Sequence, residues 1–402
     1  MKNINRRTFL QRSILTSAGA MLLSDQLLNA MTAGPAAKNR KLVVIQLSGG
    51  NDGLNMIVPY ADNLYYKARP VIAVAKNDVL KASKYQGFNP VMKSFKSLYD
   101  QNRLTVINSV GYPNPNRSHF RSMDIWQSAS DADQYLNTGW IGRYLSALPD
   151  DQRKPHKAIE VDSNIDLALK GNTITGLSME HPEKLYDSLR RGLFRPLTKI
   201  NKGVTGNPNL DYIHNIMSET VASVDYINQK TGNSKISSGA GRGKGRLFSN
   251  LSIIAGMIKA GLSTSVYYTT LSGFDTHVNQ KPQQTRLLKE LSEGVGSFVS
   301  ELDDGNYMDD VMILIFSEFG RRVAQNASNG TDHGCANNII LIGNGLKKTG
   351  FYNDPPDLKD LDKGDIKYQV DFRSVYATIL NNHLNSNADE ILGGEFPNLR
   401  FV

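Results

Sequence analysis

The sequence predicts an α/β fold built on a mostly parallel central sheet, and two observations support this prediction. An unbroken apolar run at residues 312–316 and largely apolar segments at residues 41–47 and 104–110 have the composition of strands that are covered on both faces. Segments with apolar residues at helical spacing lie between these runs, as in the crossover connections of parallel strands. Because several runs end in glycine and then in polar side chains, we expect a functional site at the carboxyl ends of the strands.

The composition is that of an ordinary globular protein. With 402 residues, 40% hydrophobic and 21% charged, the chain is long enough for one large α/β domain or two smaller ones. The formal charge is +8, but four basic residues and one acidic residue fall in the first 37, and the remaining excess is too mild to predict nucleic-acid binding. The single cysteine, Cys335, excludes an internal disulfide; a buried thiol is its simplest role, and a soft metal ligand is the alternative.

The amino terminus has the pattern of a twin-arginine export signal. Arg6 and Arg7 precede a weakly apolar segment, residues 13–23, and small residues follow it. We therefore expect residues 1–37 to be a signal peptide and linker, and the protein to be periplasmic or extracellular after meeting the Tat export machinery. The apolar segment is too short to remain as a transmembrane anchor. The alternative is an amphipathic helix with a chance arginine pair.

The first strand, residues 41–47, ends in the glycine-rich segment 48–53. Asn51 and Asp52 follow the glycines and present polar groups just past the strand end. We take Asp52 as a candidate metal ligand and Asn51 as a candidate substrate contact. A phosphate-cradling loop is less favoured because the dinucleotide fingerprint and the Walker lysine are absent from this segment, and an Asx turn is the simplest alternative.

A second buried strand, residues 104–110, leads into a loop and then a helix that runs through Trp126. Asn116 or Ser118 caps this helix in our interpretation. A serine near the positive end of the helix dipole favours an oxyanion, either a bound substrate or a developing alkoxide, whereas simple capping is the alternative. The neighbouring side chains that suit anion binding or catalysis are Arg117, His119 and Arg121.

The middle of the chain is predicted to contain strands and helices but few candidate site residues. Residues 158–161 and 174–177 are predicted to be short strands, and a mainly helical accessory region is expected at about residues 180–246. A later strand, residues 264–271, again ends in a glycine, and Asp275 and His277 follow it. Both side chains reach one metal ion if the backbone turns between them.

The strand at residues 312–316 delivers Glu318 and Arg321 to its carboxyl end, and Asp332 and His333 come before the next apolar run. Glu318 suits two roles, a metal ligand or a base that supports one. Parallel strands of one sheet bring such ends to a common edge, and several carboxylates placed together there need a cation. We therefore predict one or two divalent metal ions bound by five side chains: Asp52, Asp275, His277, Asp332 and His333.

These motifs together resemble an exported bacterial family known as domain of unknown function 1501, which is grouped with the alkaline phosphatase-like superfamily. The resemblance covers essentially the whole mature chain. It rests on the twin-arginine pattern and on Leu47-Ser-Gly-Gly-Asn-Asp-Gly53, Arg117-Ser-His-Phe120, Gly273-Phe-Asp-Thr-His277, Ser317-Glu-Phe-Gly-Arg321 and Thr331-Asp-His-Gly334. It implies a three-layer α/β/α sandwich over residues 38–402, with divalent metals above the strand ends.

By this resemblance, Asp52 is the aspartate that bridges two metals, Asp332 and His333 share one metal, and Asp275 and His277 bind the other. Ser118 lies where the superfamily places its nucleophile. The superfamily spaces its aspartate and histidine by four residues, whereas Asp275 and His277 are two apart, and the expected third histidine has only His383 as a candidate. The Cys/Ser-x-Pro-x-Arg context of sulfatases is absent, which favours phosphoryl over sulfuryl chemistry.

The expected activity is a metal-dependent hydrolase or transferase that acts on phosphate esters, or less favourably on sulfate esters. Zinc or manganese suits this ligand set best, with calcium or magnesium as alternatives. We expect a small anionic ester or a glycan as substrate, with Arg117, Arg121 or Arg321 holding its nonbridging oxygens. The alternative is an exported scaffold of the same fold that binds a glycan or a protein without turnover.

Overall fold

The computed structural model describes residues 39–191, 207–232 and 245–402. The predicted export signal, residues 1–37, lies outside the described residues. All described elements after Asn39 belong to one unit, Arg40–Val402. Within the described residues, every helix is too short or too polar to cross a membrane.

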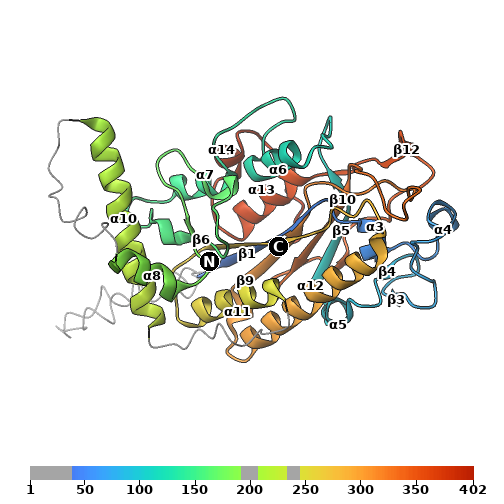
Figure 1. The fold of residues 1–402 in the computed structure, drawn as a ribbon, viewed down its shortest axis with the longest axis horizontal. Coiled ribbons are helices and arrows are strands. Elements are labelled where there is room, and N and C mark those ends of the chain that lie inside the picture. The colour runs from blue at the N-terminus through green and yellow to red at the C-terminus, as the bar shows by residue number, and fades with distance from the viewer. Residues whose placement is uncertain (1–38, 192–206, 233–244) are drawn as a thin grey trace, which may run out of the picture. The chain divides into compact units, whose positions relative to one another are not determined.

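One large sheet forms the centre of this unit (Figure 1). Its strand order is β11-β5-β10-β9-β1-β8-β6-β7, and β14 also pairs with β5. All its strand pairings are parallel except the two made by β10, which runs antiparallel to both β9 and β5. The strand bounds are β1 (Lys41–Ser48), β5 (Leu104–Gly111), β6 (Ala158–Glu160), β7 (Leu177–Ser178), β8 (Val266–Ser272), β9 (Val311–Phe316), β10 (Asn337–Ile342), β11 (Gly350–Phe351) and β14 (Val370–Asp371).

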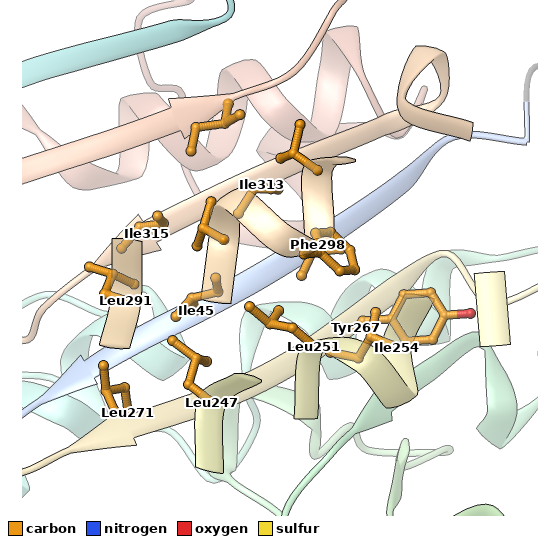
Figure 2. Close-up of a cluster of buried hydrophobic side chains, with 14 of the residues drawn as sticks. Ile45, Leu247, Leu251, Ile254, Tyr267, Leu271, Leu291, Phe298, Ile313 and Ile315 are labelled. Atoms are coloured by element: carbon orange, nitrogen blue, oxygen red, sulfur yellow. The ribbon is translucent and has the colours of Figure 1, made fainter. Parts of the chain in front are cut away.

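The alternation of side chains along β1 shows why both faces of the sheet are covered. Val43 and Ile45 belong to one buried cluster, and Leu42 and Val44 belong to another on the opposite face. Figure 2 shows the first cluster, where side chains of helices α11 (Arg246–Lys259) and α12 (Gln280–Asp303) meet the strands. Helix α5 (Lys93–Asp100) also packs on this face. The second face is covered by α6 (His119–Ser128), α7 (Trp140–Ala147), α13 (Phe372–Asn382) and α14 (Ala388–Leu392) (Figure 1).

Smaller elements surround this sandwich. A short three-stranded sheet contains β2 (Ile57–Val58), β3 (Leu80–Lys81) and β4 (Gly87–Phe88), and a hairpin pairs β12 (Leu361–Asp362) with β13 (Asp365–Ile366). The short helices include α3 (Gly53–Met56) and α4 (Asn63–Ala68). Two helices fall in the predicted accessory region, α8 (Pro182–Arg191) and α10 (Pro208–Thr231).

The predicted fold class, a three-layer α/β/α sandwich with a mostly parallel sheet, is confirmed. The apolar runs predicted to be strands form β1, β5, β9 and β10. The direction of β10 was not predicted, and it matters for the site. Because β10 reverses, the segment between β9 and β10 stays at the carboxyl edge of the parallel strands, and so Asp332 and His333 remain there too.

Candidate metal centre

The loop after β1 contains two glycines whose backbone conformations allow a very close approach of neighbouring segments. Gly49 has φ +116°, and a Cβ there would lie 2.4 Å from the backbone nitrogen of Asp275. Gly50 has φ +68°, and a Cβ there would lie 2.2 Å from the ring of Phe319. The glycines thus let the loop after β8 and the segment after β9 close over the end of β1.

Three imidazoles converge on one carboxylate oxygen in this region. The Oδ1 atom of Asp275 lies 3.0 Å from Nε2 of His277, 3.2 Å from Nε2 of His333 and 3.4 Å from Nε2 of His119. The Nε2 atoms of His277 and His333 are 2.9 Å apart. Phe319 packs against the rings of His119 and His333 at 4.8 Å between centroids, which limits how these imidazoles can turn. The side chains come from the ends of β8, β9 and β5.

Each of the three imidazoles has an oxygen atom beside its other ring nitrogen. Nδ1 of His119 contacts Oε1 of Glu318 at 2.8 Å, and Nδ1 of His333 contacts the carbonyl oxygen of Arg117 at 2.8 Å. Nδ1 of His277 lies 3.4 Å from Oδ1 of Asp332, which is a longer contact. Because these oxygens accept hydrogen bonds, they favour the proton on Nδ1 and leave the Nε2 lone pair directed toward Asp275.

This arrangement fits a metal ion by the chemistry of its donors. Three imidazole nitrogens and one carboxylate oxygen are ligands that zinc accepts, and ligand atoms of a tetrahedral zinc site are separated by about 3.3 Å. The separations of Asp275 Oδ1 from the three Nε2 atoms, and of the His277 and His333 Nε2 atoms from each other, are 2.9 to 3.4 Å, which is of that size. Two Nε2 lone pairs facing each other repel, so a cation between them, or a proton on one of them, is needed. Among the described residues, the ligand atoms of His119, Asp275 and His333 all lie within 4.8 Å of one another.

Arg321 holds the backbone around this cluster. Its side chain is fully buried and donates hydrogen bonds to the carbonyl oxygens of Gly49, Gly50, Phe274 and Thr331, and to Oδ1 of Asp275 at 2.7 Å. Burial alone would raise the pKa of Asp275, but the hydrogen bond from Arg321, and after it the contact with His333, hold that pKa well below its usual range. Asp275 is therefore a carboxylate at all ordinary pH values. Since the Arg321 donors are engaged, we assign this side chain to positioning the loops.

The pKa values of His119 and His333 are shifted in opposite directions. The hydrogen bond to buried Glu318 is the main cause that raises the pKa of His119. Desolvation is the main cause that lowers the pKa of His333, although Asp275 acts in the opposite direction. Glu318 itself is fully buried and also accepts a 2.8 Å hydrogen bond from the backbone N–H of Gly49. Two roles were considered for Glu318, a metal ligand and a base that supports a ligand. Its position favours the second role, because it contacts Nδ1 of His119 and orients that imidazole.

Asp52 does not enter this group of ligand atoms. Its Oδ2 atom forms a 2.6 Å ion pair with the buried Arg69 and also accepts from Gln280. Its Oδ1 atom is buried and has no hydrogen-bond partner among the described residues. A cation there would lie beside the Arg69 guanidinium. Asp275 also pairs with a buried arginine, but it is partly exposed and faces three imidazoles, whereas no imidazole contacts Asp52 among the described residues. The structure therefore favours a structural ion pair at Asp52 over the predicted metal ligand.

Asp332 contacts the cluster only through His277. Its carboxylate faces Nδ1 of His277 and accepts a 3.2 Å hydrogen bond from Asn326, so it orients an imidazole that points toward Asp275. His383 lies elsewhere: its Nε2 contacts the carbonyl oxygen of Lys41, at the amino end of β1, while the cluster lies past the carboxyl end. Burial lowers the pKa of His383 to about 4, so it is a neutral structural histidine. The candidate third ligand is His119, which the sequence had suggested for catalysis.

Of the three residues predicted to contact the substrate, two are buried and one is partly exposed. Asn51 is completely buried, and its amide faces Met56. Arg121 is buried as well and donates to the carbonyl oxygens of Asp131, Ala132 and Gln134, so it braces a loop and does not face a substrate. Arg117 pairs with Asp365 but remains partly exposed, and it is the candidate that can still meet an anion.

Ser118 is the N-cap residue of α6, is exposed, and makes no capping hydrogen bond through its side chain. Its hydroxyl is therefore free to face solvent next to His119. Ser122, four positions further along α6, is a second serine of this segment, but it is buried and donates a 2.6 Å hydrogen bond to the carbonyl oxygen of Glu318. Its burial and this hydrogen bond favour Ser118 as the candidate.

The sequence did not indicate Arg69 or Gln280 as residues of this edge. Arg69 follows α4, and no motif connects it to Asp52, which lies 17 positions earlier. Gln280 is the first residue of α12 and contacts Asp52 across 228 positions. The only available signal was that a buried carboxylate needs a partner, which names no residue.

The chain belongs to the family described as protein of unknown function (DUF1501), whose sequence model matches residues 108–394. The resemblance stated from the motifs is thereby confirmed for that family. No curated protein matches the chain.

Three solved structures are similar in architecture. They are the C-terminal periplasmic domain of EcEptC from Escherichia coli in complex with Zn (11% identity, TM-score 0.38, 76% of this chain and 72% of that one), PsFucS1 sulfatase from Pseudoalteromonas sp. (11%, 0.37, 94% and 72%) and a protein in the alkaline phosphatase superfamily from Vibrio parahaemolyticus (10%, 0.34, 79% and 63%). At these identities the likeness concerns the general fold alone.

Proposed function

We propose that this chain is a metal-dependent hydrolase or transferase that acts on phosphate esters, with sulfate esters less favoured. The observation that carries the proposal is the convergence of three Nε2 atoms on Oδ1 of Asp275, each imidazole having an oxygen beside its Nδ1. Such a set of oriented neutral imidazoles and one carboxylate is typical of a site that binds a transition metal.

We assign one divalent ion to His119, Asp275, His277 and His333. Three imidazoles favour zinc, with manganese as the second choice, over calcium or magnesium, which prefer oxygen ligands alone. When bound, such an ion neutralises the nonbridging oxygens of an ester and lowers the barrier to nucleophilic attack. A second ion at Asp52 is not part of the proposal, because that carboxylate is buried against Arg69 and Gln280 and no imidazole contacts it among the described residues.

The residues of the chain itself then have separate tasks. Ser118 is the proposed nucleophile, because its exposed hydroxyl stands beside His119 at the start of α6, where backbone N–H groups favour an anion. Glu318 keeps the proton of His119 on Nδ1. Arg117 offers a cation at the rim, while Arg321 fixes Asp275.

The proposal includes export by the twin-arginine route to the periplasm or beyond, supported by Arg6 and Arg7 ahead of a weakly apolar segment. A small anionic ester or a glycan that carries one is the proposed substrate. The absence of the sulfatase nucleophile context supports phosphate over sulfate.

The test is elemental analysis of the purified, folded protein together with a screen of phosphate and sulfate esters. We expect about one equivalent of metal, its loss in His333→Ala, and its retention in a matched control, His214→Ala, on α10. Metal-dependent ester cleavage supports the proposal. A folded wild type that binds no added zinc or manganese overturns it and favours a scaffold that binds a glycan or protein without turnover.

A further inference from the structure

A cavity of about 710 Å³ opens beside the candidate metal centre. Its size is within the range of pockets that hold small organic ligands. Arg117 forms part of its wall, and the backbone carbonyl of the same residue accepts the hydrogen bond from His333. Other lining side chains are Cys335, Lys363, Lys367 and Tyr368. Cavity and cluster thus share the segment that precedes α6.

The far wall of the cavity is the hairpin β12–β13, which is fixed to the site by one buried carboxylate. Asp365, on β13, pairs with Arg117 and accepts a hydrogen bond from the thiol of Cys335. Arg322, which follows Arg321, lies 3.7 Å from the same carboxylate. The hairpin is therefore held in place relative to the residues next to His119 and His333.

The turn of this hairpin places a lysine at an unusual position. Lys363 has φ +51° and Gly364 has φ +92°, the pattern of a two-residue turn in which both central residues are left-handed. Asparagine or aspartate normally occupies the first of these positions, because a long side chain with a Cβ is less favourable there. A lysine at a conformationally costly turn position is a reason to look for a function of its side chain.

The charges around the cavity single out Lys363. Arg117 is neutralised by Asp365, and Lys367 by Asp360. In the described part of the chain, Lys363 forms no ion pair. Among the described residues that line the cavity, the one carboxylate is the exposed Asp362, next to Lys363. The cavity therefore combines an ammonium group that forms no ion pair among the described residues with the partly exposed ring of Tyr368.

We infer that this cavity is a substrate subsite that binds a second negatively charged group, carried on a sugar-sized unit beyond the reacting ester, and that Lys363 selects for that charge. An ammonium group supplies charge-assisted hydrogen bonds to a sulfate, phosphate or carboxylate, and an exposed aromatic ring suits the apolar face of a sugar. This inference rests on the proposed function, since it describes the remainder of the same substrate.

The test is calorimetric titration of the folded full chain with three probes: a monosulfated disaccharide, a disaccharide containing a uronic acid, and the neutral disaccharide. We expect the anionic probes to bind and the neutral one to bind roughly tenfold more weakly. Lys363→Asn should remove most of this preference while leaving the thermal unfolding midpoint equal or higher, because asparagine suits the turn. The matched control is Lys359→Asn, at an exposed lysine just before β12 and outside the cavity lining, which should bind as the wild type does.

Equal affinity of wild type and Lys363→Asn for the anionic probes overturns the inference, as does the absence of binding at millimolar concentration. Metal content, measured on the same samples, separates this result from the proposed function. If the protein binds no metal but prefers anionic probes through Lys363, the subsite is supported and the proposed metal-dependent activity is overturned. If the protein binds one equivalent of metal but shows no such preference, the proposed function is supported and the subsite is overturned.

Discussion

Asp52 and Asp275 occupy equivalent places at the ends of parallel strands but differ in exposure and in the residues around them. Each follows a parallel strand, β1 or β8, and each is paired with a fully buried arginine. Asp52 is 1% exposed, enclosed by Arg69 and Gln280, whereas Asp275 is 49% exposed and faces three imidazoles. The comparison shows that a strand end brings a carboxylate to the edge of the sheet, but its partners decide whether it is structural or can bind a ligand.

Glu160, at the end of the neighbouring strand β6, extends this comparison. It is 1% exposed and accepts a 2.8 Å hydrogen bond from the backbone N–H of Asp166. Among the described residues it has no arginine or lysine partner. Burial, with Asp166 as a further cause, raises its pKa to about 9. Three adjacent strands therefore end in a carboxylate buried in an ion pair, a carboxylate that faces three imidazoles, and a carboxyl group whose pKa burial raises.

The largest expected effect is the loss of the metal in Asp275→Asn. This change removes the one anionic member of the proposed ligand set while keeping its shape, so the metal content of folded protein should fall from about one equivalent to nearly none. Elemental analysis after gel filtration, with circular dichroism to confirm folding, measures it. A full equivalent in the folded variant would show that Asp275 is not a ligand.

Asp52→Ala should leave metal binding intact but destabilise the fold. The variant strands the Arg69 guanidinium in the interior, which costs about 3–5 kcal/mol of unfolding free energy. Urea denaturation measures this loss, and a double variant, Asp52→Leu with Arg69→Met, should recover part of it. If folded Asp52→Ala instead loses its metal, the result would show that Asp52 takes part in metal binding.

Asp332→Asn should weaken the metal site without emptying it. Because the carboxylate acts through a long contact to His277, we expect affinity to fall roughly tenfold, at the low end of the range for residues that orient a ligand. Competition with a chromogenic chelator measures the dissociation constant. Complete loss of metal would mean that Asp332 binds the ion directly.

Glu160→Gln tests the third carboxyl by pH. A folded-state pKa raised above the unfolded value means that stability is present below about pH 4.5 and is lost as pH rises toward 9, because the unfolded chain ionises more easily. The neutral amide removes this dependence, so the variant should exceed the wild type at pH 9 by about 1 kcal/mol or more. Urea midpoints at pH 5 and pH 9 provide the comparison; parallel pH profiles would argue against a protonated Glu160.

Ser118→Ala should have the smallest effect on stability, below about 0.5 kcal/mol, because its hydroxyl makes no capping hydrogen bond. Any ester hydrolysis should nevertheless disappear, with metal content unchanged. Thermal unfolding and the ester assay, run on one preparation, separate the two. Retained turnover would assign the attack to water.

Much of the fold was predictable from the sequence, since residues buried on both faces of a strand must be apolar over the whole run, as in β1 and β9. The general place of the site followed from the polar residues after those runs. The membership of the cluster did not follow. Asp52 and Asp332 look the same as Asp275 in the sequence. Only the structure shows that Asp52 is enclosed by Arg69 and Gln280, and that Asp332 lies beside Nδ1 of His277 whereas Asp275 lies beside its Nε2.

The orientation of each imidazole was likewise hidden from the sequence. His119 was recognised as a candidate for catalysis, but its direction depends on Glu318, 199 positions away. The cavity of the β12–β13 hairpin was missed altogether, because its lining residues carry no motif, and a lysine–glycine turn attracts no notice until its φ angles are known.

The central position of β1 has a consequence for the synthesis of the chain. Val44 pairs in register with Tyr268 on one side and with Leu314 on the other, so the first strand made waits for the partners made much later. At ordinary translation rates that interval is roughly 15 to 50 s. Nascent chains that end before β9 leave an apolar strand edge open, and we expect them to depend on chaperones and to aggregate when truncated.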